Sequence, residues 1–196
     1  RGYAANLEKA ASRIPPPPAC IEQVAMHKEP TPGARSCDDL RRLFPDLPLE
    51  RMLKTVLYRA VYPPDKKHPN GRAETVAVMA RGDREINEVK LVNHLGALGV
   101  DLADDKAVRE ATGADPGFAG PIGLKPGVRL LADRSVDGVN GFLCGGNETD
   151  THWLDVWFGR DLPQPETHDF GLVKAGDSMA EGAPGAEGAG SKDTLE

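Results

Sequence analysis

The sequence predicts an α/β or α+β domain built around a mixed sheet. Two β-rich runs, KTVLYRAVY (54–62) and ETVAVMA (74–80), are joined by a polar Pro/Gly loop, so a long hairpin is the simplest pairing. Further strand-like and helix-like segments interleave through short links, which is typical of a sheet covered by helices. The 196 residues, 39% hydrophobic and 28% charged, have the composition of an ordinary globular protein.

The first elements are short and are bounded by turn and cap residues. Residues Ile21–His27 alternate as in a strand, and Thr31–Gly33 (TPG) forms a turn. Ser36 caps a helix that runs through Phe44, with acidic residues suited to its positive N-terminal end. Pro48 opens a second short helix.

The hairpin strands Lys54–Tyr62 and Glu74–Ala80 are followed by two helices. Ile86–Leu98 carries apolar residues at helical spacing, and Asp104–Thr112 is a helix that Gly113 terminates. Three more strands complete the expected fold: Val128–Asp133, Val139–Cys144 and His152–Phe158.

Both ends of the sequence differ in composition from the middle. Residues 1–20 end in four consecutive prolines, which predict a stiff, extended connector. Residues 175–196 are rich in Gly, Ala and acid and can bury little apolar surface, so they predict a flexible tail. The compact domain is therefore expected at 21–174.

Location is predicted from what the sequence does not contain. Neither an eighteen-residue apolar run nor an N-terminal apolar signal core is present, so we expect no membrane association and a cytoplasmic location. Cys20, Cys37 and Cys144 match no zinc spacing and leave an odd thiol, which favours a reducing compartment with neither metal nor disulfide.

The net charge of −6 is unevenly distributed. Residues 161–196 carry this net charge of −6, and the charges of the preceding residues cancel to zero. Within that neutral part, residues 31–72 hold nine basic side chains against five acidic ones. A partner rich in phosphate is therefore permitted, although composition does not require one.

A few residues have the chemistry of a site, each with a plainer alternative. The loop Gly117–Pro121 lets backbone N–H groups approach a carbonyl or phosphate, or is simply a turn. Lys90 sits at the edge of an apolar helical stripe and reaches toward a groove, or is solvated. His152 precedes a strand and orients water or caps the sheet, and Asp133 pairs with Arg134 or with a loop amide. The GxSxG, HExxH and GxxxxGK[ST] patterns are absent from the sequence.

Several segments, taken in order, resemble the insertion domain of bacterial-type prolyl-tRNA synthetase, of the YbaK/aminoacyl-tRNA deacylase-like superfamily. The resemblance spans nearly the whole chain and implies the editing-domain fold of that superfamily, a mostly antiparallel sheet or partial barrel flanked by helices. The segments that carry it are GYAANLEKA (2–10), RGDREINEVKL (81–91), ATGADPGFAGPIGL (111–124), ADRSV (132–136) and FLCGGNETDTHWLDVWFGRDLP (142–163).

The resemblance implies a post-transfer editing activity, the hydrolysis of alanine wrongly esterified to proline tRNA while prolyl-tRNA is spared. Lys90 matches the lysine of the NEVK motif and is expected to meet the terminal phosphate. Thr55 matches a threonine at the pocket wall, and Asp133 and His152 match pocket supports. The loop expected to surround the aminoacyl carbonyl consists of Gly117, Phe118, Ala119, Gly120 and Pro121.

The resemblance also implies the partners and cofactors. We expect the acceptor end of tRNA(Pro) carrying alanine, a synthetase catalytic core in cis, and no DNA. Because the chain lacks core motifs and starts without Met, it is expected to be a piece of a larger synthetase. Editing needs no cofactor, and ATP and Mg²⁺ would serve only the core. The tail lacks the cysteine pair that many relatives carry, which puts a metal in the parent enzyme in doubt.

Such modest residues suffice for the chemistry because an aminoacyl ester is already activated. Hydrolysis requires an oriented water, which the adjacent ribose hydroxyl can assist, and stabilisation of the oxyanion by the glycine loop. A small second pocket would admit alanine and exclude the proline ring.

Three alternatives remain open at the level of sequence. A relative of the same fold removes cysteine rather than alanine. A non-catalytic insertion would only dock the tRNA. In a third interpretation the basic stretch 31–72 binds the RNA, and charge reversal at Arg41 and Arg42 would then weaken that binding.

Overall fold

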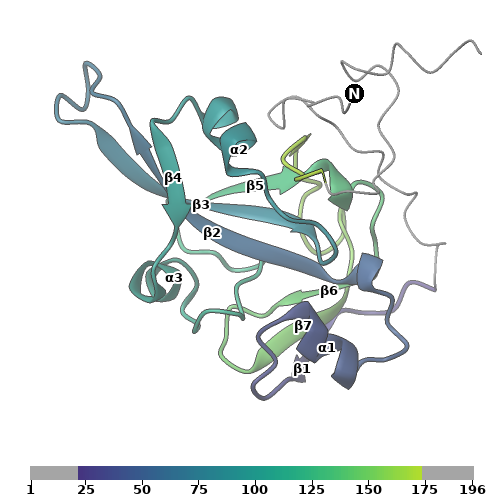
Figure 1. Cartoon of the computed structure of the whole chain (residues 1–196). Helices are drawn as coiled ribbons and strands as arrows, with labels where there is room; N and C mark the ends of the chain where they lie inside the picture. The colour runs from purple at the N-terminus through teal and green to yellow at the C-terminus, as the bar shows by residue number, and fades with distance from the viewer. Residues whose placement is uncertain (1–21, 174–196) are drawn as a thin grey trace, which may run out of the picture.

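The computed structural model describes residues 22–173 as a mixed α/β fold of two sheets and three α-helices (Figure 1). The predicted connector at 1–20 and the predicted tail at 175–196 lie outside the described residues, so the domain limits remain predictions. In the described part of the chain, no helix is long and apolar enough to cross a membrane.

The larger sheet has five strands and contains the predicted hairpin. β2 and β3 pair antiparallel from Leu53↔Arg81 to Tyr62↔Arg72, whereas β3–β5 and β5–β8 are parallel, so the sheet is mixed. β4 and β8 were not predicted, since four and two residues are too few to show a period. The strand order is β4 (Gly99–Leu102), β2 (Leu53–Tyr62), β3 (Arg72–Arg81), β5 (Arg129–Asp133) and β8 (Thr167–His168).

The smaller sheet is antiparallel, in the order β1 (His27–Pro30), β7 (Thr151–Val156) and β6 (Phe142–Gly145). An isolated bridge joins Leu143 of β6 to Met52, the residue before β2, and the sheets of the described residues do not close into a barrel. The prediction of a strand ending at His27 was wrong: the strand begins there, because its partner is β7, with His27 opposite Leu154.

Two of the three α-helices in the described residues begin where the sequence predicts. In α1 (Cys37–Leu43), Ser36 and Asp39 form a capping box, and in α3 (Asp105–Thr112) Asp104 accepts from the Ala107 N–H. Gly113 ends α3 in the left-handed conformation, as predicted. Short 3₁₀ turns occupy Leu49–Arg51 and Arg134–Val136.

The helix α2 (Glu88–Leu95) is shorter than the predicted span of Ile86–Leu98. The Asn87 side chain accepts from two N–H groups at its start, and Gly96 ends it at φ 63°. The left-handed glycine turns the chain toward β4, so Leu98 lies outside the helix.

The helices α2 and α3 cover opposite faces of the five-stranded sheet (Figure 1). Because side chains alternate along β2, Tyr58 packs with Leu91 of α2, whereas Leu57 packs with Val108 of α3. The neighbours of Leu57 on this second face, Thr55 among them, border the cavity described next.

Candidate active site

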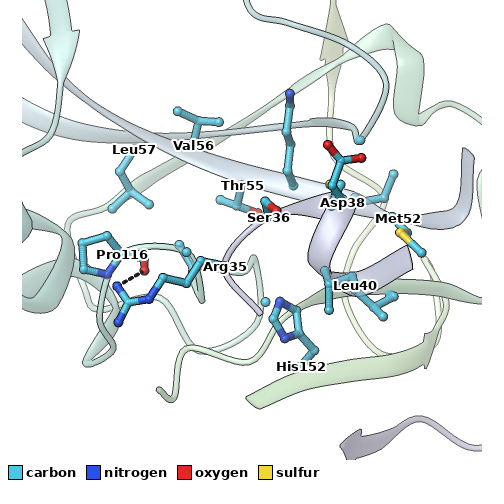
Figure 2. A pocket seen from close by; sticks show the side chains of 18 of the residues that line it. Arg35, Ser36, Asp38, Leu40, Met52, Thr55, Val56, Leu57, Pro116 and His152 are labelled. Atoms are coloured by element: carbon cyan, nitrogen blue, oxygen red, sulfur yellow. Dashed lines mark hydrogen bonds between the residues drawn. The ribbon is translucent and has the colours of Figure 1, made fainter. Parts of the chain in front are cut away.

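A cavity of about 500 Å³ lies between β2, the segment that leads into α1, the loop around Gly117 and the adjoining ends of β6 and β7 (Figure 2). The structure brings Thr55, Gly117, Ala119 and His152 to its wall, four of the residues predicted for the site. They come from three separate parts of the sequence and meet only through the fold.

Thr55 lies on β2, opposite Met79 of β3, and its side chain lines the cavity. It is 8% exposed, and its Oγ1 has no hydrogen-bond partner among the described residues. A buried hydroxyl without a partner is costly to the fold. At the wall of a cavity, such a hydroxyl is a donor or acceptor available to a bound molecule.

His152 enters the site from β7 and is only 3% exposed. Its Nδ1 lies 2.6 Å from the Thr31 Oγ1, and its ring meets the Phe118 ring edge-on at 5.7 Å between centroids. Burial lowers the pKa of His152 to about 4, so the imidazole is neutral at neutral pH. It can exchange hydrogen bonds but supplies no charge.

The loop Gly117–Pro121 forms one wall, and its glycines allow close approach of backbone to backbone. A Cβ on Gly120 would lie 1.8 Å from the carbonyl oxygen of Gly145 in β6. Gly117 adopts φ +100°, and a Cβ there would lie 2.6 Å from the Cβ of Arg35. The glycine at 120 therefore serves packing against β6, while Gly117 and Ala119 face the cavity.

Asn147 fastens this loop and was not predicted. Its Oδ1 accepts from the Gly120 N–H at 2.8 Å, and its Nδ2 donates to the carbonyls of Gly120 and Ile122 at 3.0 and 2.7 Å. The amide of Gly120 is therefore occupied by the protein rather than left for an oxyanion. The run GGN indicates only a left-handed turn, which Asn147 makes at φ 51°.

Arg35 is a second residue that the sequence did not single out. Its Nη1 donates to the Pro116 carbonyl at 3.2 Å beside the cavity (Figure 2), and its guanidinium lies 5.5 Å from the centre of the Phe118 ring. A basic residue next to a helix cap carries no sequence signal of such a position.

Lys90 does not line the cavity, contrary to the prediction that it reaches a groove there. It is 7% exposed, and its Nζ donates to Asp169 Oδ1 at 3.0 Å and to the Gly171 carbonyl at 2.9 Å. The physical reason is that α2 packs on the other face of the sheet from the glycine loop. The structure thus brings Lys90 to the segment after β8 rather than to Gly117.

Asp133 is also away from the cavity wall. It is 1% exposed, and its two carboxylate oxygens accept the N–H groups of Ser135 and Phe170 at 2.9 and 2.8 Å. These bonds cap the 3₁₀ turn after β5 and hold the C-terminal segment. The predicted substrate contact is not supported by this position.

No group of three or more His, Cys, Asp or Glu side chains is placed to hold a metal ion in the described range 22–173. The cavity instead offers one unpartnered hydroxyl, one neutral imidazole, loop backbone and a guanidinium. This set suits the binding of an anion-bearing ester and its attack by water.

Comparison with protein families identifies this arrangement. Residues 31–161 match the family model described as the aminoacyl-tRNA editing domain. The chain belongs to this family. The matched span contains the whole cavity wall, from Arg35 to His152.

The editing domain has relatives among the proline–tRNA ligases. It is 36% identical over 182 residues to the enzyme of Dechloromonas aromatica and 37% identical over 181 residues to that of Stenotrophomonas maltophilia, each match covering 92% of the chain. The chain spans 30% of the length of each of these relatives. The resemblance to prolyl-tRNA synthetase is therefore confirmed.

A solved structure supports the fold. A suggested trans-editing enzyme for prolyl tRNA synthetase superposes with a TM-score of 0.53 at 14% identity, covering 67% of this chain and 76% of the other. The expected editing-domain fold is confirmed on that basis.

Proposed function

We propose that this editing domain hydrolyses the ester of alanine mischarged to proline tRNA and spares prolyl-tRNA. The proposal is supported by the family, by relatives named proline–tRNA ligase, and by a cavity whose wall holds the unpartnered Thr55 hydroxyl and the His152 imidazole. The acceptor end of the tRNA and a synthetase core in cis are the proposed partners. A cytoplasmic location and the absence of a cofactor for editing remain predictions.

The observation that carries the proposal is the unpartnered Thr55 hydroxyl in the cavity wall. In ester hydrolysis negative charge develops on the carbonyl oxygen as water attacks, and a fixed donor at that point lowers the barrier. The Thr55 hydroxyl is such a donor. The ribose hydroxyl next to the ester, which RNA carries, assists the water.

His152 then acts as a neutral group. Its pKa of about 4 keeps it uncharged at neutral pH, and the Thr31 hydroxyl fixes its ring orientation. It positions substrate or water by a hydrogen bond rather than by charge. The placement of Lys90 and Asp133 gives neither a part in this chemistry.

Discrimination against proline is proposed to be steric. The backbones of Gly120 and Gly145 are in contact, and the Asn147 side chain bonds to the backbone of Gly120 and Ile122. A loop held in this way cannot move to make room for the five-membered ring of proline, so the cavity wall keeps its shape. A cavity of about 500 Å³ has room for the terminal ribose as well as a small amino acid.

The test is a deacylation time course of the 196-residue chain with alanyl-, cysteinyl- and prolyl-tRNA(Pro). We expect release of alanine and retention of proline. Faster release of cysteine than of alanine would assign the chain to the cysteine-removing activity. Binding of tRNA without hydrolysis of any ester would make it a docking domain, and either result would overturn the proposal.

A further inference from the structure

Two residues with a permanent positive charge line the cavity in the described part of the chain, Arg35 and Lys54. The Lys54 Nζ lies 3.2 Å from Glu85 Oε1, and its side chain is 24% exposed, so its charge is largely compensated. Arg35 differs from it in both exposure and pairing.

The Arg35 side chain is 55% exposed and is held in place by neutral groups. Its aliphatic stem packs against Gly117, Nη1 donates to the Pro116 carbonyl at 3.2 Å, and the guanidinium lies over the Phe118 ring. These contacts fix the position of the cation at the edge of the cavity without neutralising it.

The Asp115 carboxylate beside Arg35 is weakly placed to cancel the charge of the guanidinium. Asp115 Oδ2 lies 4.0 Å from Arg35 Nη2, at the limit of an ion pair, and Asp115 Oδ1 already accepts from Arg109 Nε at 2.8 Å. A guanidinium has five N–H donors in a planar fork that matches a phosphate. The bond from Nη1 to the Pro116 carbonyl uses one of them.

We infer that Arg35 binds the 5′-phosphate of the terminal nucleotide whose aminoacyl ester occupies the cavity. This inference rests on the proposed function. The ester and the phosphate are attached to the same ribose, so a cation at the edge of the ester cavity meets the phosphate. Lys90, for which that contact was expected, lies on the other face of the sheet and is bound to Asp169.

The experiment measures binding of an uncharged RNA minihelix with a single-stranded 3′ end, by fluorescence anisotropy over about 0.1 to 1 M salt. The variants are Arg35→Gln, which keeps the stem and an N–H donor but loses the charge, and Arg35→Lys, which keeps the charge. The matched control is Lys106→Gln, since Lys106 is 84% exposed, pairs with Glu110, does not line the cavity and lies outside the basic stretch 31–72.

One phosphate contact to a single strand contributes about 0.7 to the slope of log K against log salt. We therefore expect Arg35→Gln to lower the slope by about 0.7 and the affinity about five-fold at the low-salt end relative to the high-salt end. Arg35→Lys should retain most of the slope, and Lys106→Gln should change it little.

Equal slopes for Arg35→Gln and Lys106→Gln would overturn the inference, as would an intact chain that does not bind the minihelix. Because the RNA carries no amino acid, this result is independent of hydrolysis. A chain that binds through Arg35 but cleaves no ester would refute the proposed function alone. A chain that edits with an unchanged salt slope in Arg35→Gln would refute the inference alone.

Discussion

Replacing Thr55 by valine removes one buried hydroxyl and keeps the branched shape of the side chain. The hydroxyl has no partner among the described residues, and threonine and valine both suit a strand such as β2. If the hydroxyl serves the reaction, the substitution should stabilise the fold and slow the chemistry. These two effects have opposite signs, which distinguishes a functional group from a structural one.

The magnitudes follow from the burial of the group. Leaving a buried hydroxyl unsatisfied costs about 1–3 kcal/mol, so Thr55→Val should raise the free energy of unfolding by about 1 kcal/mol and Tm by about 2–4 °C. Loss of one donor to a developing oxyanion lowers kcat about 10²- to 10³-fold. Single-turnover release of alanine and thermal unfolding measure the two quantities.

Thr112 provides the control because its buried hydroxyl is satisfied. Its Oγ1 donates to the Val108 carbonyl at 2.7 Å and accepts from the Ala114 N–H at 3.0 Å. Thr112→Val should therefore lower stability by about 1–2 kcal/mol and leave deacylation unchanged. A Thr55→Val protein that loses stability, or that cleaves the ester at the normal rate, would refute the reasoning.

The other predictions concern pH, packing and the misplaced lysine. Burial lowers the pKa of His152 to about 4 in the folded protein, against ~6.5 in the unfolded chain, so the unfolded chain takes up a proton first as the pH falls. The free energy of unfolding should therefore decrease by about 3 kcal/mol between about pH 7 and about pH 4. Urea unfolding at both ends of that range should show this loss in the normal protein and a smaller one in His152→Asn. In Gly120→Ala the added Cβ would lie 1.8 Å from backbone, so the free energy of unfolding should decrease by about 3 kcal/mol or more. In Gly99→Ala the added Cβ has nothing within 4 Å, so the same assay should show a change of no more than about 0.5 kcal/mol. Lys90→Ala should lower the free energy of unfolding by about 2 kcal/mol, because it loses the bond to Asp169. It should change kcat less than Thr55→Val does. Complete loss of deacylation by a normally stable Lys90→Ala protein would contradict this.

Elements with strong local signals could be predicted from the sequence, and those that depend on a distant partner could not. The hairpin around the loop after Tyr62 and the helix starts at Ser36 and Asp104 follow from local periodicity and capping. The strand β1 begins at His27 because β7, more than a hundred residues later, pairs with it there. No local pattern specifies that register.

The same distinction applies to the site. Thr55 and His152 were predicted, and they reach the cavity because each lies on a strand at its wall. Lys90 was misplaced because helix periodicity gives the face of α2 but not the face of the sheet on which α2 packs. Asn147 was missed because its side chain exchanges hydrogen bonds with the backbone of a loop some 25 residues earlier, a contact that no local pattern indicates.

At the cavity wall the fold departs from the rule that buried polar groups are paired, as it also does at the buried Trp157 Nε1 elsewhere in the described residues. Asp133, equally buried on the same molecule, has both carboxylate oxygens occupied by backbone N–H groups, and the buried Thr112 hydroxyl is satisfied within its own helix end. Thr55 is buried to a similar degree, and a valine there would pack as well at lower cost. A polar group retained at such a cost beside a cavity is accounted for if a bound molecule completes its hydrogen bond. The same reasoning separates Thr55 from Asp133, because a group whose partners are all supplied by the protein has no bond left to give a substrate.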